Sequence, residues 1–148
     1  MQVFDRVLTG ATGADSLTLS FDRRVRSRQR VQLDNGQPAL LALPRGTVLR
    51  GGDVLGGPDG ACVLVRAASE TVSTATADTP LLLLRAVYHL GNRHVAVQLG
   101  SDWLRYLHDH VLDDMLRGLG LQVAVDELPF EPEAGAYAAP GHGHTHTH

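Results

Sequence analysis

The stretch TPLLLLRAVYHLG, residues 79–91, decides how the second half of the chain folds. Thr79 is a favoured N-cap residue and Pro80 suits the first helical turn, so a helix is predicted to begin here. Gly91 can adopt the left-handed conformation that ends a helix. The pattern therefore predicts a helix over residues 81–90.

Strand patterns lie on both sides of this helix. Residues 94–99 alternate between polar and apolar side chains, which predicts a half-buried strand that begins at His94. Residues 103–108 are rich in aromatic and apolar residues and predict a second strand, and residues 121–125 predict a third. Residues 70–77 add one more strand if they are also extended.

A second helix is predicted over residues 111–119, where apolar residues recur at helical spacing. Asp113, Asp114 and Arg117 fall on its opposite, polar side, and Gly118 and Gly120 stand near its end. The resulting order β-α-β-β-α-β is the ferredoxin-like arrangement. One face of its sheet is covered by helices and the other is open.

The first half of the chain has short apolar runs separated by strong turn signals. One signal, Asp34-Asn35-Gly36, predicts a hairpin, and closely spaced strands of this kind predict a small all-β sandwich or barrel. The predicted fold class is α+β. It comprises a β-rich domain over residues 1–72, a ferredoxin-like domain over residues 73–138 and a flexible His-rich tail over residues 139–148.

The tail carries four of the eight histidines, at every second position: His142, His144, His146 and His148. Imidazole is a common ligand for divalent transition ions, and the Gly and Thr spacers leave the backbone free to wrap around one. An expression tag is the other interpretation, although tags are usually unbroken histidine runs. The tail predicts metal affinity, which a buffer, a chaperone or an enzyme could all use.

His94 is the first candidate ligand outside the tail. In the predicted strand its ring points away from the helix-covered core, onto the open face of the sheet. Two copies of a chain commonly meet on such a face, and a two-fold axis beside His94 would bring two imidazoles together around an ion. A solvated surface histidine fits the same pattern.

His108 and His110 are the second candidates, separated by Asp109. Two imidazoles at i and i+2 of extended backbone lie on the same side and can chelate an ion. Asp109 can cap the next helix or orient a ring. The alternative is that one histidine caps the helix and the other is exposed. His89, near the end of the first helix, is interpreted as structural and is not assigned to the site.

Alternating arginines form another pattern, at Arg24, Arg26, Arg28 and Arg30. They predict a row of guanidinium groups on one face of a strand. Such a row is either a docking surface for an acidic partner or a solvated face. It lacks the interleaved aromatic residues expected of a platform for single-stranded nucleic acid.

The bulk composition narrows the function classes. The net charge of −3 gives no general attraction to nucleic acid or anionic membranes, and no apolar run is long enough to span a bilayer. Cys62 is the only cysteine, and together with the lack of a signal peptide this favours the cytoplasm. The usual catalytic motifs are absent, so binding and transfer of metal fit better than an enzyme.

Several blocks of the chain resemble the UreE family of urease accessory proteins, which are nickel metallochaperones. The blocks are LPRGTVLR over residues 43–50, GNRH over residues 91–94, LRYLHDHVLDDML over residues 104–116 and PFEPEAGAY over residues 129–137. The resemblance implies a homodimer whose β-rich domain engages partner proteins and whose ferredoxin-like domain binds metal. It also implies delivery of Ni(II) to urease apoprotein together with the other accessory proteins, including their GTPase.

By the same resemblance, His94 matches the histidine that binds metal at the dimer interface, and His108 and His110 match a peripheral metal site of some members. The tail matches the family's variable His-rich end. The expected function is a nickel chaperone for urease, and Cu(II) or Zn(II) would fit the same ligands. A general buffer for divalent metals without a urease partner is the alternative, and a protein-binding module built on the arginines is a third hypothesis.

Overall fold

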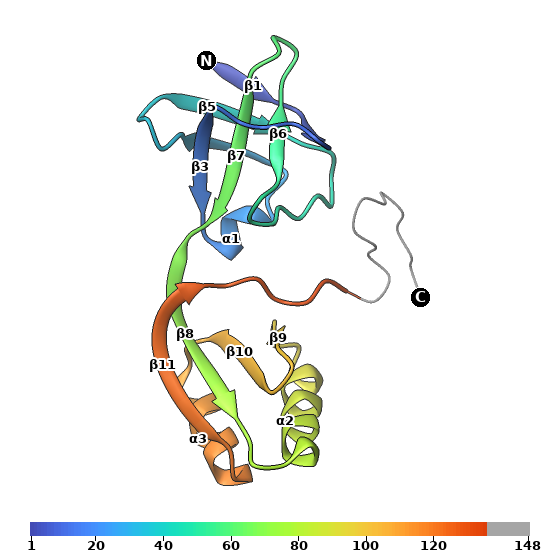
Figure 1. Cartoon of the computed structure of the whole chain (residues 1–148), viewed down its shortest axis with the longest axis vertical. Coiled ribbons are helices and arrows are strands. Elements are labelled where there is room, and N and C mark those ends of the chain that lie inside the picture. The colour runs from blue at the N-terminus through green and yellow to red at the C-terminus, as the bar shows by residue number, and fades with distance from the viewer. Residues whose placement is uncertain (136–148) are drawn as a thin grey trace. The chain divides into compact units, whose positions relative to one another are not determined.

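A computed structural model of the chain describes residues 1–135, in which one compact unit ends at Ala68 and a second begins at Ser69. Both strands and helices are present, so the fold class is α+β (Figure 1). The sequence pattern predicts the division later, after residue 72. The structure divides the chain earlier because β8 (Ser69–Thr76) already pairs with β11 (Gln122–Pro129) from its first residue onward.

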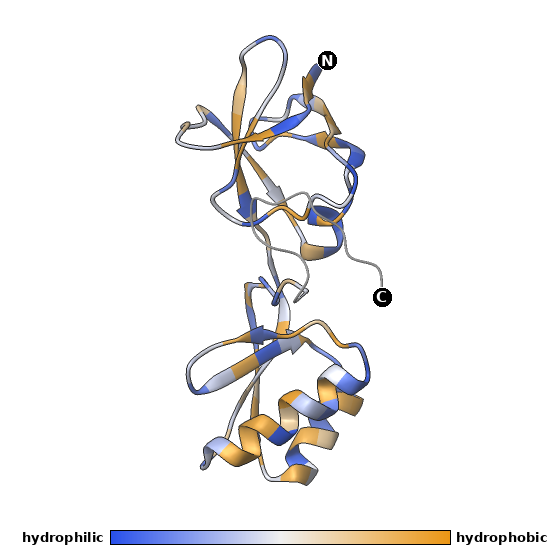
Figure 2. Ribbon diagram, turned by 90° about the vertical axis from the view of Figure 1, so that its right-hand side faces the viewer, coloured by the Kyte–Doolittle hydropathy of each residue, from blue (hydrophilic) through white to orange (hydrophobic). Residues whose placement is uncertain are grey.

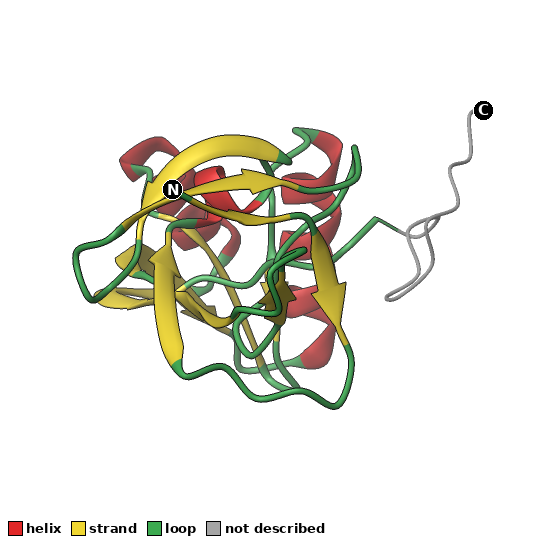
Figure 3. Cartoon of the chain, turned by 90° about the horizontal axis from the view of Figure 1, so that it is seen from above, coloured by secondary structure: helices red, strands yellow, loops and turns green. Residues whose placement is uncertain are grey.

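The first unit consists of strands and loops with one short helix, α1 (Phe21–Arg24) (Figure 1). Figure 3 shows its strands in yellow around the N-terminus. One sheet has the order β1 (Gln2–Phe4), β5 (Pro38–Ala42), β4 (Arg28–Gln32). The other has the order β2 (Arg6–Leu8), β6 (Val54–Gly56), β7 (Cys62–Ala67), β3 (Asp15–Leu19). Residues from both sheets share one apolar core, so the unit is a small β structure as predicted.

The predicted hairpin at Asp34-Asn35-Gly36 is confirmed, because β4 and β5 are antiparallel neighbours joined by this turn. The turn also reaches the other sheet. Ser16 and Thr18 of β3 donate hydroxyl hydrogen bonds to the Asp34 carboxylate at 2.6 and 2.9 Å. The hydrogen bond from Ser16 is the main reason that the pKa of Asp34 lies below its ordinary value.

The predicted row of arginines on one strand face is wrong. Arg24 lies in α1 and is fully buried, where its guanidinium donates to two backbone carbonyls. Arg26 lies between α1 and β4 and pairs with a carboxylate of α1 at 2.8 Å. Of the four, Arg28 and Arg30 are on β4, because the chain turns through α1 before the strand begins.

The second unit begins with β8 and ends with β11. Between them lie α2 (Pro80–Asn92), β9 (Gln98–Leu99), β10 (Trp103–Leu107) and α3 (His110–Leu119). The sheet order is β11-β8-β10-β9 with antiparallel neighbours. The cross-strand partners Val123, Ala75 and Leu104 share one face and pack in one core with residues of both helices. The helices therefore cover the same face of the sheet.

The ends of the two helices are mostly those predicted. The Thr79 hydroxyl accepts a hydrogen bond from the Leu82 N–H and caps α2. Gly120 ends α3 in the left-handed conformation, with a φ of 106°. Gly91 does not end α2, which continues to Asn92.

The strand predicted over residues 94–99 is wrong for most of its length. Gln98 and Leu99 alone among these residues pair with β10, and His94 lies in a turn that follows α2. Across residues 1–135, every helix is too short or too polar to pass through a bilayer.

Candidate metal site

His94 lies in the turn that closes α2, and not on the open face of the sheet as predicted. Its N–H donates to the Gly91 carbonyl at 3.0 Å, and the Val95 N–H donates to the Leu90 carbonyl at 3.1 Å. This is the hydrogen-bond pairing of a Schellman motif, with His94 at the position that usually holds glycine. The motif satisfies the carbonyls of Leu90 and Gly91 in the last turn of α2.

The backbone of His94 has an unusual conformation. Within residues 1–135 it is the one residue other than glycine with a positive φ, at 58°. A side chain in this region costs on the order of 1 kcal/mol. Leu90 is buried and Val95 packs against the same core, so packing on both sides of the turn holds it closed. The imidazole is exposed.

An exposed apolar stripe runs along α2 toward this turn. Leu81, Leu84 and Tyr88 are 54%, 65% and 68% exposed, and their three- and four-residue spacing places them on one helix face. Gly91 continues the stripe, with open space where a side chain would be. Apolar bands along this helix are seen in Figure 2. Grouped apolar side chains of this exposure mark a surface suited to a partner.

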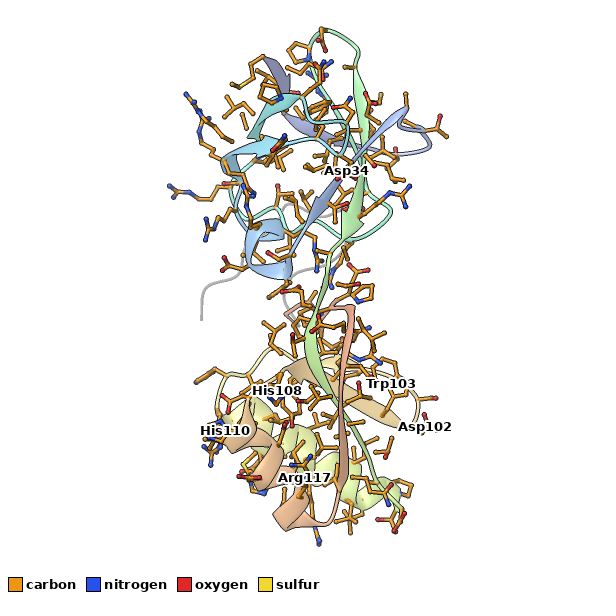
Figure 4. All side chains as sticks on the ribbon, turned by 90° about the vertical axis from the view of Figure 1, so that its left-hand side faces the viewer. Asp34, Asp102, Trp103, His108, His110 and Arg117 are labelled. Carbon is orange, nitrogen blue, oxygen red and sulfur yellow. The ribbon has the colours of Figure 1, made fainter. Side chains whose placement is uncertain are left out.

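His108 and His110 lie on either side of the N-cap of α3, at the opposite end of β10 from Trp103 (Figure 4). The cap is Asp109, whose carboxylate accepts the Val111 N–H at 2.8 Å and the Leu112 N–H at 3.2 Å. The alternative in which a histidine caps the helix is therefore wrong. Both histidines are exposed, and chelation by the pair stays a prediction.

His108 is held from its buried side by two polar residues, and a third holds one of these two. Its Nδ1 lies 3.1 Å from Asp113 Oδ2 and 3.0 Å from Ser73 Oγ. The Tyr106 hydroxyl donates to Asp113 Oδ1 at 2.6 Å. Burial, and then the hydrogen bond to Asp113, raise the pKa of Tyr106 well above its ordinary value. The phenol is therefore neutral and acts as a hydrogen-bond donor.

Asp113 is the residue that the sequence pattern misplaced. It is predicted on the polar side of α3, yet it is 2% exposed, whereas the apolar Val111 is 58% exposed. Tyr106 could have indicated from the sequence that Asp113 is buried, because the hydroxyl of a tyrosine on the core face of a strand needs a hydrogen-bond partner. Asp113 supplies that partner from the facing helix.

The described chain does not complete a metal site by itself. Residues 1–135 contain no group of three His, Cys, Asp or Glu side chains that could hold a metal. The tail histidines His142, His144, His146 and His148 lie outside the described residues. His94, and likewise the pair His108 and His110, would need further ligands from the tail, a second copy of the chain or solvent.

The chain that follows β11 runs back toward β9 (Figure 1). The Glu131 N–H donates to Gln98 Oε1 at 3.0 Å, and the Glu133 N–H donates to the Val97 carbonyl at 2.8 Å. Val97 is three residues from His94. A chain extends at most about 3.6 Å per residue, so the nine residues from Glu133 to His142 can span roughly 30 Å. The chain beyond Glu133 is therefore long enough to reach His94.

Comparison with known proteins identifies the family. A family model described as UreE urease accessory protein, C-terminal domain, matches residues 70–148, and one described as UreE urease accessory protein, N-terminal domain, matches residues 8–68. The chain belongs to the UreE family. The two matched ranges meet where the structure divides into units, between Ala68 and Ser69.

Individual UreE relatives match over most of their length. The urease accessory protein UreE of Citrobacter koseri is 56% identical over 144 residues, which cover 97% of this chain and 95% of that protein. The one from Pseudomonas putida is 55% identical over 130 residues, 87% and 79% of the two chains. The one from Vibrio parahaemolyticus is 55% identical over 132 residues, 86% and 83%. This UreE-family chain is an accessory protein and not an enzyme.

Proposed function

We propose that this chain is a nickel chaperone for urease, which binds Ni(II) between two copies of the chain and delivers it for assembly of the urease nickel centre. The observation that carries the proposal is His94, an exposed imidazole held in a left-handed turn by the packing around it. Unfavourable backbone conformations that packing maintains are concentrated at functional sites. Nickel is the cargo in this proposal.

The second copy of the chain is proposed to dock on the apolar stripe of α2. The stripe, formed by Leu81, Leu84 and Tyr88, leads to the turn of His94. In a two-fold dimer the same surface meets itself, so a residue near the axis lies near its own copy. Two His94 rings would then supply two imidazoles to one ion. The open space at Gly91 would let the partner approach closely.

The proposed ligands suit an ion that must be released. Exposed imidazoles are neutral donors, and a site with few of them holds an ion less firmly than a closed thiolate cage. His142, His144, His146 and His148 are proposed to complete the shell, and the anchoring of Glu133 beside Val97 supports their reach. His108 and His110 are proposed as a peripheral site. Cu(II) and Zn(II) fit the same donors. We propose nickel because the chain belongs to a family of urease accessory proteins.

The two units and the tail are proposed to have separate roles. The β-rich unit would contact urease apoprotein and the other accessory proteins, including their GTPase. The second unit would be a ferredoxin-like metal-binding domain, which the sheet order β11-β8-β10-β9 supports. The tail, residues 139–148, would collect metal. We place the protein in the cytoplasm, because its single cysteine forms no disulfide within the chain.

Nickel titration of a His94→Ala variant tests the site. We expect calorimetry to show loss of high-affinity nickel binding, because both copies of the central ligand are removed. Deletion of residues 142–148 should mainly lower the number of ions bound. His89→Ala, which removes an unassigned histidine of α2, is the matched control and should leave binding unchanged. Tight binding by the His94→Ala variant would remove this site from the proposal.

A general buffer for divalent metals is the second candidate function, favoured by the exposed pair His108 and His110 outside the α2 turn. Both functions predict binding of nickel. An assay of urease activation separates them, because a chaperone loaded with nickel should increase active urease at limiting nickel and a buffer should not.

A further inference from the structure

A buried polar group lies under His108, between α3 and the sheet. Asp113 and Ser73 are 2% and 0% exposed. A buried carboxylate is costly unless its oxygens are hydrogen-bonded, and a well-packed apolar residue at such a position is often at least as stabilising. The Tyr106 hydroxyl accounts for one oxygen of Asp113, and the other oxygen faces His108.

The contacts of Asp113 determine which nitrogen of His108 carries the proton. Oδ1 accepts the Tyr106 hydroxyl at 2.6 Å, and Oδ2 lies 3.1 Å from Nδ1 of His108. A carboxylate accepts hydrogen bonds and donates none, so Nδ1 is the donor. In the neutral ring the free lone pair is then on Nε2.

Nε2 is the nitrogen that the fold leaves available. The side chain of His108 is 37% exposed, whereas that of Asp113 is 3% exposed. Within residues 1–135 the polar contacts of the His108 ring are all made by Nδ1. Histidines that bind metal characteristically donate their other ring N–H to a carboxylate or carbonyl, which fixes the tautomer and the ring orientation and raises ligand basicity. The pair of Asp113 and His108 has this arrangement.

We infer that Asp113 is the positioning residue of the peripheral metal site. It holds His108 in the tautomer whose Nε2 binds the ion, while Tyr106 and Ser73 fix the carboxylate and the ring from the buried side. The inference rests on the proposed function, which makes His108 a metal ligand. The inference adds to the proposed site residues that do not contact the ion but influence how tightly His108 binds it.

Asp113→Asn in the full-length protein tests the inference, with Zn²⁺ as a diamagnetic probe. Nitrogen-15 NMR follows the His108 ring signals, assigned by their loss in His108→Ala. Asparagine keeps the shape of the side chain, but its amide can donate to Nδ1 and so favours the opposite tautomer. We expect the ring proton to move toward Nε2 and the affinity of His108 for Zn²⁺ to fall about 10- to 100-fold.

Asp114→Asn is the matched control, because Asp114 is the next residue of α3 and its side chain is 75% exposed. It should change neither the tautomer nor the affinity. Tyr106→Phe provides a second variant that keeps the carboxylate but removes one hydrogen bond to it. It should weaken Zn²⁺ binding less than Asp113→Asn, and it carries the test if that variant fails to fold.

Two results would overturn the inference in distinguishable ways. If Asp113→Asn and Tyr106→Phe leave the tautomer and the affinity unchanged while His108→Ala loses binding, the positioning role fails and the peripheral site stands. If the His108 ring does not respond to Zn²⁺ in the unmodified protein, the peripheral site fails together with the inference. The proposed His94 site is untouched by either result, because it is titrated separately.

Discussion

At the scale of single residues, His94 is a proposed metal ligand whose backbone conformation is unfavourable. Its φ of 58° lies in the region that glycine occupies freely, and its turn is closed by hydrogen bonds to the last carbonyls of α2. Two substitutions of His94 can therefore separate the loss of the metal ligand from the loss of the backbone strain.

We expect His94→Gly to be more stable than His94→Ala by about 1 kcal/mol, because alanine retains a Cβ in the left-handed region. Both variants should lose tight nickel binding equally. Urea unfolding at one fixed protein concentration measures the difference in the free energy of unfolding. Equal stability of the two variants would show that the turn relaxes to another conformation when the imidazole is removed.

At the scale of elements, α3 depends on one side chain at its beginning. Asp109 accepts two backbone N–H groups of the first turn, and its carboxylate is favourably placed near the positive end of the helix. His108 and His110 are the residues immediately before and after this cap.

Asp109→Ala should lower the free energy of unfolding by about 1 kcal/mol, because the two N–H groups lose their acceptor. Asp109→Asn is the control, since asparagine is a comparable cap and should be close to neutral. Thermal or urea unfolding measures both. A neutral Asp109→Ala would mean that water satisfies the first turn equally well.

The hairpin turn of the first unit depends on the ionised form of Asp34. Its pKa is lowered, chiefly by the hydrogen bond from Ser16, so the carboxylate is more favourable in the folded chain than in the unfolded chain. A lowered pKa adds stability above the unfolded value of roughly 3.9, and this stability is lost as the pH falls through the lower folded value.

Asp34→Asn should therefore reduce stability near neutral pH and have a smaller effect in acid, below the folded pKa of Asp34. Thermal unfolding of the wild type and the variant at a series of pH values measures the difference. Asp15→Asn, which changes an exposed aspartate at the start of β3, is the control and should show a smaller dependence. A difference that does not vary with pH would contradict the role of the charge.

At the scale of the whole molecule, the proposed dimer depends on the apolar stripe of α2. Leu84→Glu places a charge in the middle of this stripe, where burial against a second copy would be costly. We expect the variant to be monomeric by sedimentation velocity and to bind nickel more weakly, because the two His94 rings no longer converge. Val48→Glu changes a 45% exposed valine of the first unit and should leave the dimer intact. If the Leu84→Glu variant is still a dimer, the interface does not lie on this stripe.

Patterns formed by residues close together in the sequence were sufficient to predict much of the fold. The cap of Thr79, the end of α3 at Gly120 and the hairpin at Asp34-Asn35-Gly36 are found where they are predicted. Each depends on the conformational preference of a residue and on hydrogen bonds within a few positions of it. The same local information identified His94, His108 and His110 as candidate ligands by type, although not by their surroundings.

The tertiary structure alone decided those surroundings, because they depend on contacts between distant parts of the chain. Gly91 could have ended α2, but packing of Leu90 and Val95 against the core of the second unit extends the helix and puts His94 in the left-handed turn. The helical pattern places Asp113 on the exposed side of α3. In the structure it is buried, because Tyr106 of β10 faces it with a hydroxyl that needs an acceptor. The spacing of apolar residues in the sequence indicates which residues share one face of a helix or strand. Which side chains they contact on the neighbouring element is decided only by the tertiary fold.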